Sequence, residues 1–285
     1  MGAAGPDECP WCGRPLHGAA RGPLLVCARC GVGVTVPWPT DAELDAAYAG
    51  PYRPAEGRFS GPGDAVLRRS RARLAARLDA LAPPGPVLDV GAGDGTLVRA
   101  LRARGRDAVG LERGDEEPAG PFAAIVLWHS LEHLRAPGAA LDDAAAKLVP
   151  GGVLAVAAPN LASLQARAFG ARWLAFDLPR HLVHVPAAEL VARLRAAGLE
   201  VRRVSHWRGG QVVFGWLHGL VERLAGVDLY DAIRRPDARM APLAPGRRAL
   251  ALAAGCALLP VALACAAVEV AARRGGSVYV EAVRA

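Results

Sequence analysis

A strand that runs into a glycine-rich turn is the feature that most constrains the fold of this chain. The apolar residues 87–90 lead directly into Gly91, Gly93 and Gly95, after which a helical pattern begins. Glycines let the backbone approach a ligand closely, and the first N–H groups of the following helix are available to bind it. The pattern predicts a strand–turn–helix unit of a parallel α/β sheet, with a ligand at the carboxyl end of the strand.

Acidic residues around the turn narrow the class of ligand. The third glycine follows the second after only one residue, Asp94, which departs from the dinucleotide fingerprint. Asp89 precedes the turn, where it would repel a pyrophosphate but could meet an amine. A second predicted strand ends in Glu112, whose carboxylate can accept hydrogen bonds from two ribose hydroxyls. A turn that binds no ligand is the alternative.

The chain resembles the class I S-adenosylmethionine-dependent methyltransferases, in the branch of the ubiquinone-biosynthesis O-methyltransferases. The resemblance extends from about residue 87 to 199 and rests on the segments VLDVGAGDG, GLE, IVLWHSLEHL, LVPGGVLAVAAPN and DLPRHLVHV. It implies a Rossmann-like sheet and S-adenosylmethionine as cofactor. It also implies that Asp89, Gly91 and Gly93 line the methionine end and that Glu112 holds the ribose. The full predicted cofactor-binding set is Asp89, Gly91, Gly93, Asp94, Gly95, Glu112 and Asp115.

One segment departs from the family pattern. Between the ribose acid and the next strand, relatives have a helix, a strand and an adenine-binding loop, but this chain has only the nine residues 113–121. A crossover connection alone needs about a dozen residues, so we expect the third strand and its helix to be missing or vestigial. Asp115 is expected to cap the adenine side. The acid that the family carries after Phe122 is replaced by Ala123, which predicts a weakened or more open cofactor site.

Four histidines are the candidate catalytic residues. His129 and His133 follow the fourth predicted strand, with Glu132 between them, and His181 and His184 lie in a long irregular stretch after the fifth. A histidine could act as the general base that removes a proton from the acceptor. Alternatively, Glu132 and His133 bind a divalent metal, since some relatives carry Glu-x-x-Glu-His here. The remaining alternative is that the histidines only cap helices and bond within the core.

Four cysteines near the N-terminus predict a metal site. Cys9 and Cys12, then Cys27 and Cys30, form two C-x2-C pairs that are each followed by glycine. Two such turns can make a closed tetrahedral site for structural zinc. Iron, free thiols and disulfides are the alternatives, and the role is either to staple a small fold or to dock a partner. No export signal is recognisable, which predicts a reducing, cytoplasmic location.

Composition adds little about partners. The net charge is +7, but Lys147 is the only lysine and no basic run is interleaved with aromatic residues. Nucleic acid is therefore not the expected partner.

The second half contains a long apolar segment. Residues 249–268 carry no charge and are flanked by arginine pairs. Their length is about that of a membrane span. They fall between two strands that the family pairs in one sheet, so a single crossing would leave the last strand on the wrong side. We therefore expect a helical insertion that lies on a membrane surface, with a purely soluble cap over the site and a true membrane span as the alternatives.

These observations predict four parts. They are a zinc ribbon at 1–37, a linker at 38–63, a methyltransferase domain at 64–207 plus 277–285, and the insertion at 208–276. The predicted activity is methyl transfer to a small-molecule or lipid-linked acceptor, with oxygen favoured over nitrogen or carbon, by a cytoplasmic protein that is peripheral at the membrane. The alternatives are an RNA or protein methyltransferase that docks through the ribbon, and a binding module with a degenerate cofactor site.

Overall fold

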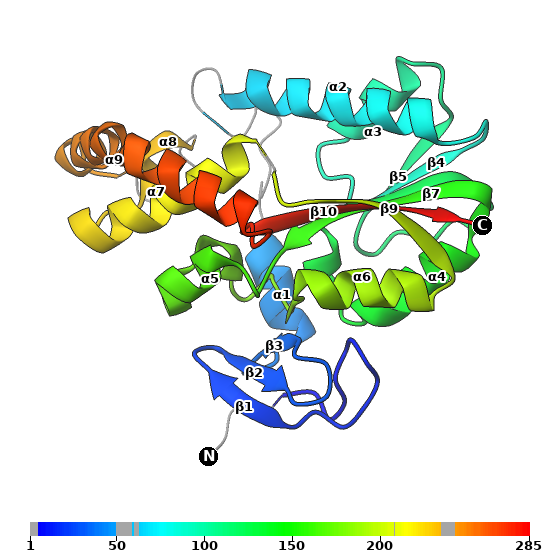
Figure 1. Ribbon diagram of the computed structural model, residues 1–285, viewed down its shortest axis with the longest axis horizontal. Helices are drawn as coiled ribbons and strands as arrows, with labels where there is room; N and C mark the ends of the chain where they lie inside the picture. Colours follow the sequence, from blue (N-terminus) through cyan, green and yellow to red (C-terminus); the bar gives the residue numbers. More distant parts are fainter. Residues whose placement is uncertain (1–4, 50–58, 60–62, 208, 235–242) are drawn as a thin grey trace.

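A six-stranded sheet forms the centre of the molecule (Figure 1). It is seen in a computed structural model, which describes residues 5–49, 59, 63–207, 209–234 and 243–285. The strand order is β5-β4-β6-β7-β10-β9. The bounds are β4 Val87–Val90, β5 Ala108–Leu111, β6 Phe122–Trp128, β7 Leu148–Pro159, β9 Leu199–Ser205 and β10 Ser277–Arg284. The first four strands in this order are parallel, and β10 is antiparallel to β7 and β9. The two strands that flank the insertion, β9 and β10, pair in one sheet, as expected.

Helices cover both faces of this sheet, as Figure 1 shows. Side chains alternate along each strand, so Val87 and Val126 face one way while Leu88 and Ile125 face the other. The first pair packs with α2 (Gly63–Leu81) and α3 (Thr96–Arg102). The second pair packs with α4 (Pro137–Ala146) and α6 (Ala187–Ala196). The predicted Rossmann-like α/β fold is confirmed.

The third strand of the family pattern is missing, as expected. Residues 112–121 form neither helix nor strand, and β5 is the edge of the sheet. A short turn replaces the crossover, closed by a hydrogen bond from the Asp115 N–H to the Glu112 carbonyl at 3.2 Å.

The N-terminal segment is a small antiparallel sheet that the rest of the chain completes. Its order is β1-β2-β3-β8, with bounds Gly18–Arg21, Leu24–Cys27, Gly33–Thr35 and Val183–His184. The last strand comes from the stretch after β7, so this sheet is joined to the methyltransferase fold by backbone pairing. Its buried residues Cys9, Trp11 and Cys27 belong to the same apolar core as Leu141 of α4. The segment therefore has no core of its own that is separate from the larger sheet.

Residues 38–63, predicted as a linker, are described only in part. The helix α1 (Asp41–Tyr48) begins with a capping box, in which Thr40 and Glu43 each bind the other's backbone N–H. Residues 50–58 and 60–62 lie outside the described part of the chain.

The described part of the insertion between β9 and β10 contains three helices. They are α7 (Gly210–Ala225), α8 (Leu229–Ile233) and α9 (Pro245–Ala271), and α5 (Leu164–Phe169) packs beside α7. The short 3-10 helices are η1 Leu131–His133, η2 Gly170–Arg172 and η3 Leu174–Phe176. We call the described residues 209–234 and 243–276 the lobe; it projects from one end of the sheet (Figure 1). By length and composition alone, α9 is apolar enough to cross a membrane.

Candidate active site

The glycine turn has the conformation that its sequence requires. Gly91, Gly93 and Gly95 have φ values of +75°, +62° and +67°, which residues with a Cβ rarely adopt. Gly91 also lies against the residue that follows His129, because a Cβ added to it would stand 2.5 Å from the Ser130 Cβ. The turn is thus held against the end of β6 and leads into α3 at Gly95.

Two acids at the end of β5 adjoin this turn. The carboxylate of Glu112 accepts a hydrogen bond from the Gly93 N–H, and its own backbone N–H donates to Asp115 Oδ2 at 2.8 Å. Both acids are exposed. Asp94 is used locally, because its Oδ1 accepts a hydrogen bond from the Thr96 N–H at 2.9 Å. Asp89 lies within β4 and is 3% exposed.

This part of the site fits S-adenosylmethionine. An exposed carboxylate at the end of the second strand suits a ribose diol, and glycine lets the backbone approach a ligand closely. Glu112 already touches the glycine turn, so a ribose bound there would adjoin both groups.

His129 lies where β6 ends, in a left-handed conformation with φ of +54°. Its Nδ1 is 3.2 Å from Glu132 Oε1. Its Nε2 faces two polar groups of the insertion and its border, Gln211 Nε2 at 3.1 Å and Ser277 Oγ at 3.4 Å. One ring nitrogen is therefore held by a carboxylate, and the other is directed toward the lobe.

Glu132 is a buried carboxylate, with 2% of the residue exposed. Burial raises its pKa, but the hydrogen bond with His129 and the charges of His129, His181 and His133 outweigh it and lower the pKa to about 2. The carboxylate is therefore ionised at neutral pH, and it favours a proton on His129 Nδ1. Its other oxygen, Oε2, has no hydrogen-bond partner within the part of the chain that the structure describes.

His133 and His181 lie on the other side of Glu132. His133 Nδ1 is 2.8 Å from the Tyr48 hydroxyl and 3.1 Å from the Arg180 carbonyl oxygen. Burial and the charge of His181 lower the pKa of His133 to about 4. One ligand atom each from Glu132, His133 and His181 lie within 4.8 Å of one another. This donor set suits a divalent cation, and the orphaned Oε2 is compatible with one.

His184 belongs to the N-terminal sheet rather than to the group of ligand atoms around Glu132. It lies in β8, is 1% exposed, and its Nε2 is 3.2 Å from Thr35 Oγ1 in the N-terminal sheet. Burial, followed by the charge of His181, lowers its pKa to about 3. The structure thus brings together three of the four predicted histidines around one carboxylate and places the fourth in the small sheet.

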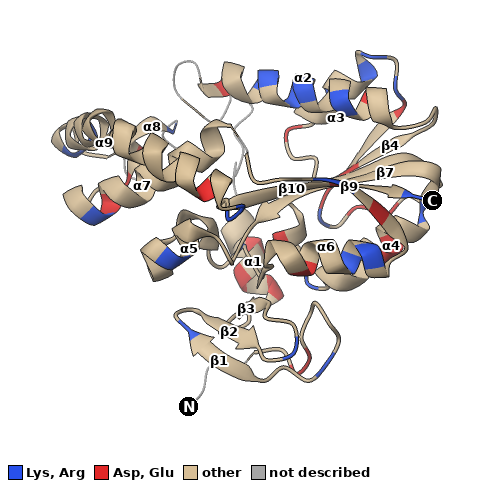
Figure 2. Cartoon of the chain, in the orientation of Figure 1, with Lys and Arg blue, Asp and Glu red and all other residues tan. Residues whose placement is uncertain are grey.

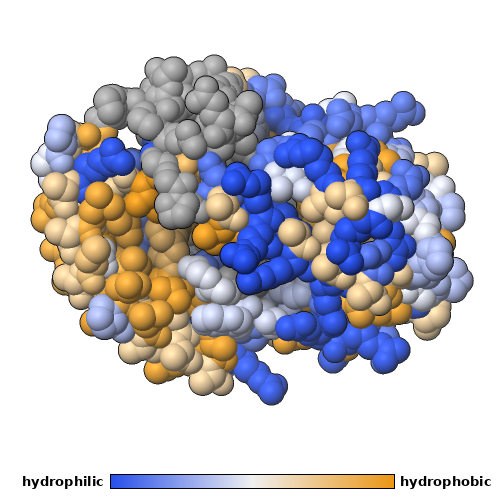
Figure 3. Space-filling model, turned by 90° about the horizontal axis from the view of Figure 1, so that it is seen from above, coloured by the Kyte–Doolittle hydropathy of each residue, from blue (hydrophilic) through white to orange (hydrophobic). Residues whose placement is uncertain are grey.

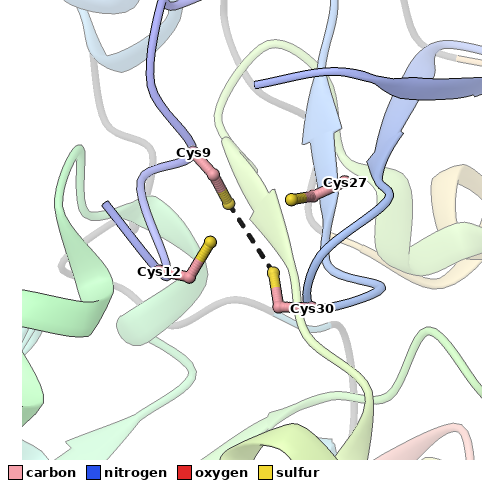
Figure 4. A group of neighbouring side chains, drawn as sticks. All are labelled: Cys9, Cys12, Cys27 and Cys30. Atoms are coloured by element: carbon pink, nitrogen blue, oxygen red, sulfur yellow. Dashed lines mark hydrogen bonds between the residues drawn. The ribbon is translucent and has the colours of Figure 1, made fainter. Parts of the chain in front are cut away.

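The four cysteines converge as their spacing predicts (Figure 4). Their sulfurs all lie within 4.8 Å of one another. The Cys9 and Cys30 sulfurs are 3.7 Å apart, close to the separation of about 3.8 Å expected for thiolates that are each about 2.3 Å from one tetrahedral zinc. The chemistry and spacing of this donor set fit zinc.

Sequence reasoning missed three polar residues that border the histidines. Gln211 and Ser277 contact His129, and Tyr48 contacts His133. Gln211 lies in the first turn of α7 and Ser277 begins β10. Gln211 and Ser277 could have been predicted, because the family topology places both ends of the insertion at the carboxyl ends of the parallel strands. Tyr48 could not have been predicted in this way.

Comparisons with known proteins agree with this fold. A family model described as "Methyltransferase domain" matches residues 63–204. The "Ubiquinone biosynthesis O-methyltransferase" of Xanthomonas axonopodis pv. citri is 30% identical over 167 residues, which cover 46% of this chain and 69% of that protein. The chain belongs to the S-adenosylmethionine-dependent methyltransferase family.

Other relatives of this methyltransferase cover a similar share of the chain. The protein of the same name from Xylella fastidiosa (strain M23) is 34% identical over 157 residues, or 43% of this chain. The match spans 63% of the length of that relative. Among solved structures, a SAM dependent methyltransferase from Archaeoglobus fulgidus has a TM-score of 0.44 and 13% identity, over 75% of this chain and 94% of that chain.

Proposed function

We propose that this methyltransferase transfers a methyl group from S-adenosylmethionine to a hydroxyl of a small-molecule or lipid-linked acceptor. The observation that carries the proposal is the contact between Glu112 and the glycine turn at the carboxyl end of β4. When bound, the cofactor supplies a methyl group on a positively charged sulfur. Nearby relatives are named as ubiquinone biosynthesis O-methyltransferases, which supports an oxygen acceptor.

We assign the proton-handling role to His129 rather than to the other three histidines. When the His129 ring is neutral, the ionised Glu132 favours the tautomer with the proton on Nδ1, which leaves the lone pair on Nε2. That atom can take the proton of an acceptor hydroxyl as its oxygen becomes bonded to the methyl carbon. Glu132 keeps the ring oriented and stabilises it once it is protonated. His133 and His184 are held neutral by burial and bonded elsewhere.

A divalent cation held by Glu132, His133 and His181 is a second candidate for activating the acceptor. The orphaned Glu132 Oε2 favours it. Chelation of bound metal followed by re-addition of magnesium or manganese separates the two schemes. Methyl transfer that is unchanged by chelation supports the His129 scheme, and transfer that is lost and then restored supports the cation.

We also propose structural zinc at Cys9, Cys12, Cys27 and Cys30, supported by the fit of their sulfurs. A lipid-linked acceptor would be met at a membrane, and we propose that the insertion 208–276 provides the contact with that surface.

The acceptor class can be tested with a labelled methyl donor. Purified wild-type protein is incubated with lipid and aqueous fractions of a cell extract, beside the His129→Asn variant. We expect label in the lipid fraction with wild-type protein and at least a hundredfold less with the variant, in line with the contribution of a positioned base. Label only in protein or RNA would contradict the proposal.

A further inference from the structure

The inner face of α9 is narrow and built from small residues. Ala251, Gly255, Ala262 and Ala266 are buried against the neighbouring helices, and a Cβ on Gly255 would stand 3.3 Å from Leu229 of α8. Small residues let helices approach closely, as they do in membrane proteins. Only 22% of the most apolar 18-residue window of α9 is buried.

The outer face of α9 exposes a continuous apolar surface. Six large side chains on it are between 41% and 62% exposed: Leu250, Leu252, Leu259, Val261, Leu263 and Val268. The one acid of the helix, Glu269, is fully buried and accepts hydrogen bonds from Gln165 and Trp216. Figure 3 shows apolar residues gathered over the lobe, on the left, whereas hydrophilic residues predominate over the rest of this face. Single exposed apolar residues are ordinary, but a patch of this extent marks a docking surface.

The charges at both ends of α9 are positive. Arg247 and Arg248 lie in its first turn and donate to the backbone carbonyls of Gly226 and Ala232. Arg273 and Arg274 follow its last turn. None of the four forms an ion pair with an acid within the described residues. Between the two arginine pairs, the buried Glu269 is the one charged residue of α9 (Figure 2).

These charges decide between two occupants of the apolar face. A second copy that packed α9 on α9 would bring arginine pairs against arginine pairs, whether the helices ran parallel or antiparallel. The phosphates of phospholipid headgroups carry the opposite charge, and each arginine near an anionic surface favours binding. The distribution of charge therefore favours lipid.

The sheet limits how α9 can enter a bilayer. The insertion starts after β9 and ends at β10, and these strands pair along their length. Both ends of the insertion are therefore on the same side of a membrane. We propose that the outer face of α9 docks into one leaflet of an anionic phospholipid bilayer, with the helix lying along the surface and the arginine pairs among the phosphates. This deepens the proposed function and rests on it for the lipid-linked acceptor.

The lobe that carries the docking face contacts the candidate base where it joins the central sheet. Gln211 near the start of the insertion and Ser277 just after its end both contact His129 Nε2. A lobe seated on lipid would thus place His129 beside the surface from which a lipid-linked acceptor arrives.

Flotation with vesicles tests this docking. The full chain is mixed with vesicles of neutral phosphatidylcholine, or with the same lipid containing phosphatidylglycerol. We expect the wild-type chain to float with the anionic vesicles. The double variant Leu259→Lys/Leu263→Lys should bind them at least about tenfold more weakly, because two charges would enter the apolar layer. Arg273→Gln with Arg274→Gln should weaken binding to anionic vesicles by about tenfold and leave binding to neutral vesicles unchanged.

A matched control comes from α2, where Val66 and Leu67 are also exposed. Val66→Lys with Leu67→Lys should float like wild type, and the thermal unfolding of all variants shows that each is folded. Equal flotation of wild type and the Leu259/Leu263 variant would overturn the proposal. The proposal would also be overturned if the wild-type chain did not bind vesicles but formed a dimer, and the Leu259/Leu263 variant were a monomer. Calorimetry of S-adenosylmethionine binding without vesicles tests the methyltransferase proposal separately.

Discussion

At the scale of the residue, Gly91 illustrates how the cofactor turn depends on the absence of a side chain. Its φ of +75° disfavours other residues, and Ser130 fills the space that a Cβ would need. Backbone strain and steric overlap therefore act at one position. Gly105 offers a comparison, because its φ of +82° is similar but nothing lies within 4 Å of a Cβ there.

Gly91→Ala should destabilise the fold more than Gly105→Ala. We expect a loss of about 1 kcal/mol in the free energy of unfolding from the positive φ alone, and about 1–3 kcal/mol more at Gly91 from the overlap. Urea denaturation measures both variants. Equal losses would show that the contact with Ser130 has no energetic weight.

The burial of His184 leads to a prediction about how the stability of the fold depends on pH. Burial and the charge of His181 lower its pKa from 6.5 to about 3. Between these values the unfolded chain binds a proton that the folded chain does not, so stability is present above pH 6.5 and is lost toward pH 3. His184→Gln should reduce the loss of unfolding free energy between pH 7 and pH 4 by about 2–3 kcal/mol.

Urea unfolding at pH 7, 5.5 and 4 measures this slope, with His17→Gln at an exposed position as the control. A slope in His184→Gln that equals that of wild type would contradict the assignment.

At the scale of the element, features within one segment of the sequence could be predicted, whereas contacts between distant segments could not. The strand and turn from Val87 to Gly95 follow from the local apolar and glycine pattern. The loss of the third strand and the position of the insertion follow from the resemblance to the family, combined with the lengths of the two segments. The pairing of β8 with β3 could not be foreseen, because it joins two-residue and three-residue strands that are far apart in the sequence. The same holds for Tyr48, which reaches His133 from a helix predicted only as part of a linker. Such contacts depend on tertiary packing, which no local pattern encodes.

The shared core makes a prediction about zinc. Because β8 and Leu141 join the cysteine sheet to the larger one, loss of metal should destabilise the whole chain. We expect about one zinc per chain, and a fall of about 10 °C or more in a single thermal transition after chelation or in Cys27→Ser. Calorimetric unfolding distinguishes this from an independent ribbon, in which the main transition would stay in place while a small one disappeared.

At the scale of the whole molecule, three surfaces meet around one edge of the central sheet. The glycine turn and Glu112 lie at the ends of β4 and β5, His129 lies at the end of β6, and the two ends of the lobe close on His129 from the other side. The position of the site at the carboxyl ends of the strands, and the residues of the turn, were predictable from the sequence. The choice of His129 as the base among the four histidines was not. Burial and hydrogen bonding distinguish His129 from His184, and neither property can be inferred from the spacing of residues.

Calorimetric titration with S-adenosylmethionine tests the central claim most directly. Glu112→Ala removes the carboxylate that we assign to the ribose, and Glu116→Ala removes an exposed acid from the same connection as a control. We predict binding by wild type and by Glu116→Ala, and at least about tenfold weaker binding by Glu112→Ala, since hydrogen bonds to a charged group contribute about 1.5–3 kcal/mol. Wild-type protein that binds neither S-adenosylmethionine nor its demethylated product, or Glu112→Ala that binds as tightly as wild type, would contradict this account.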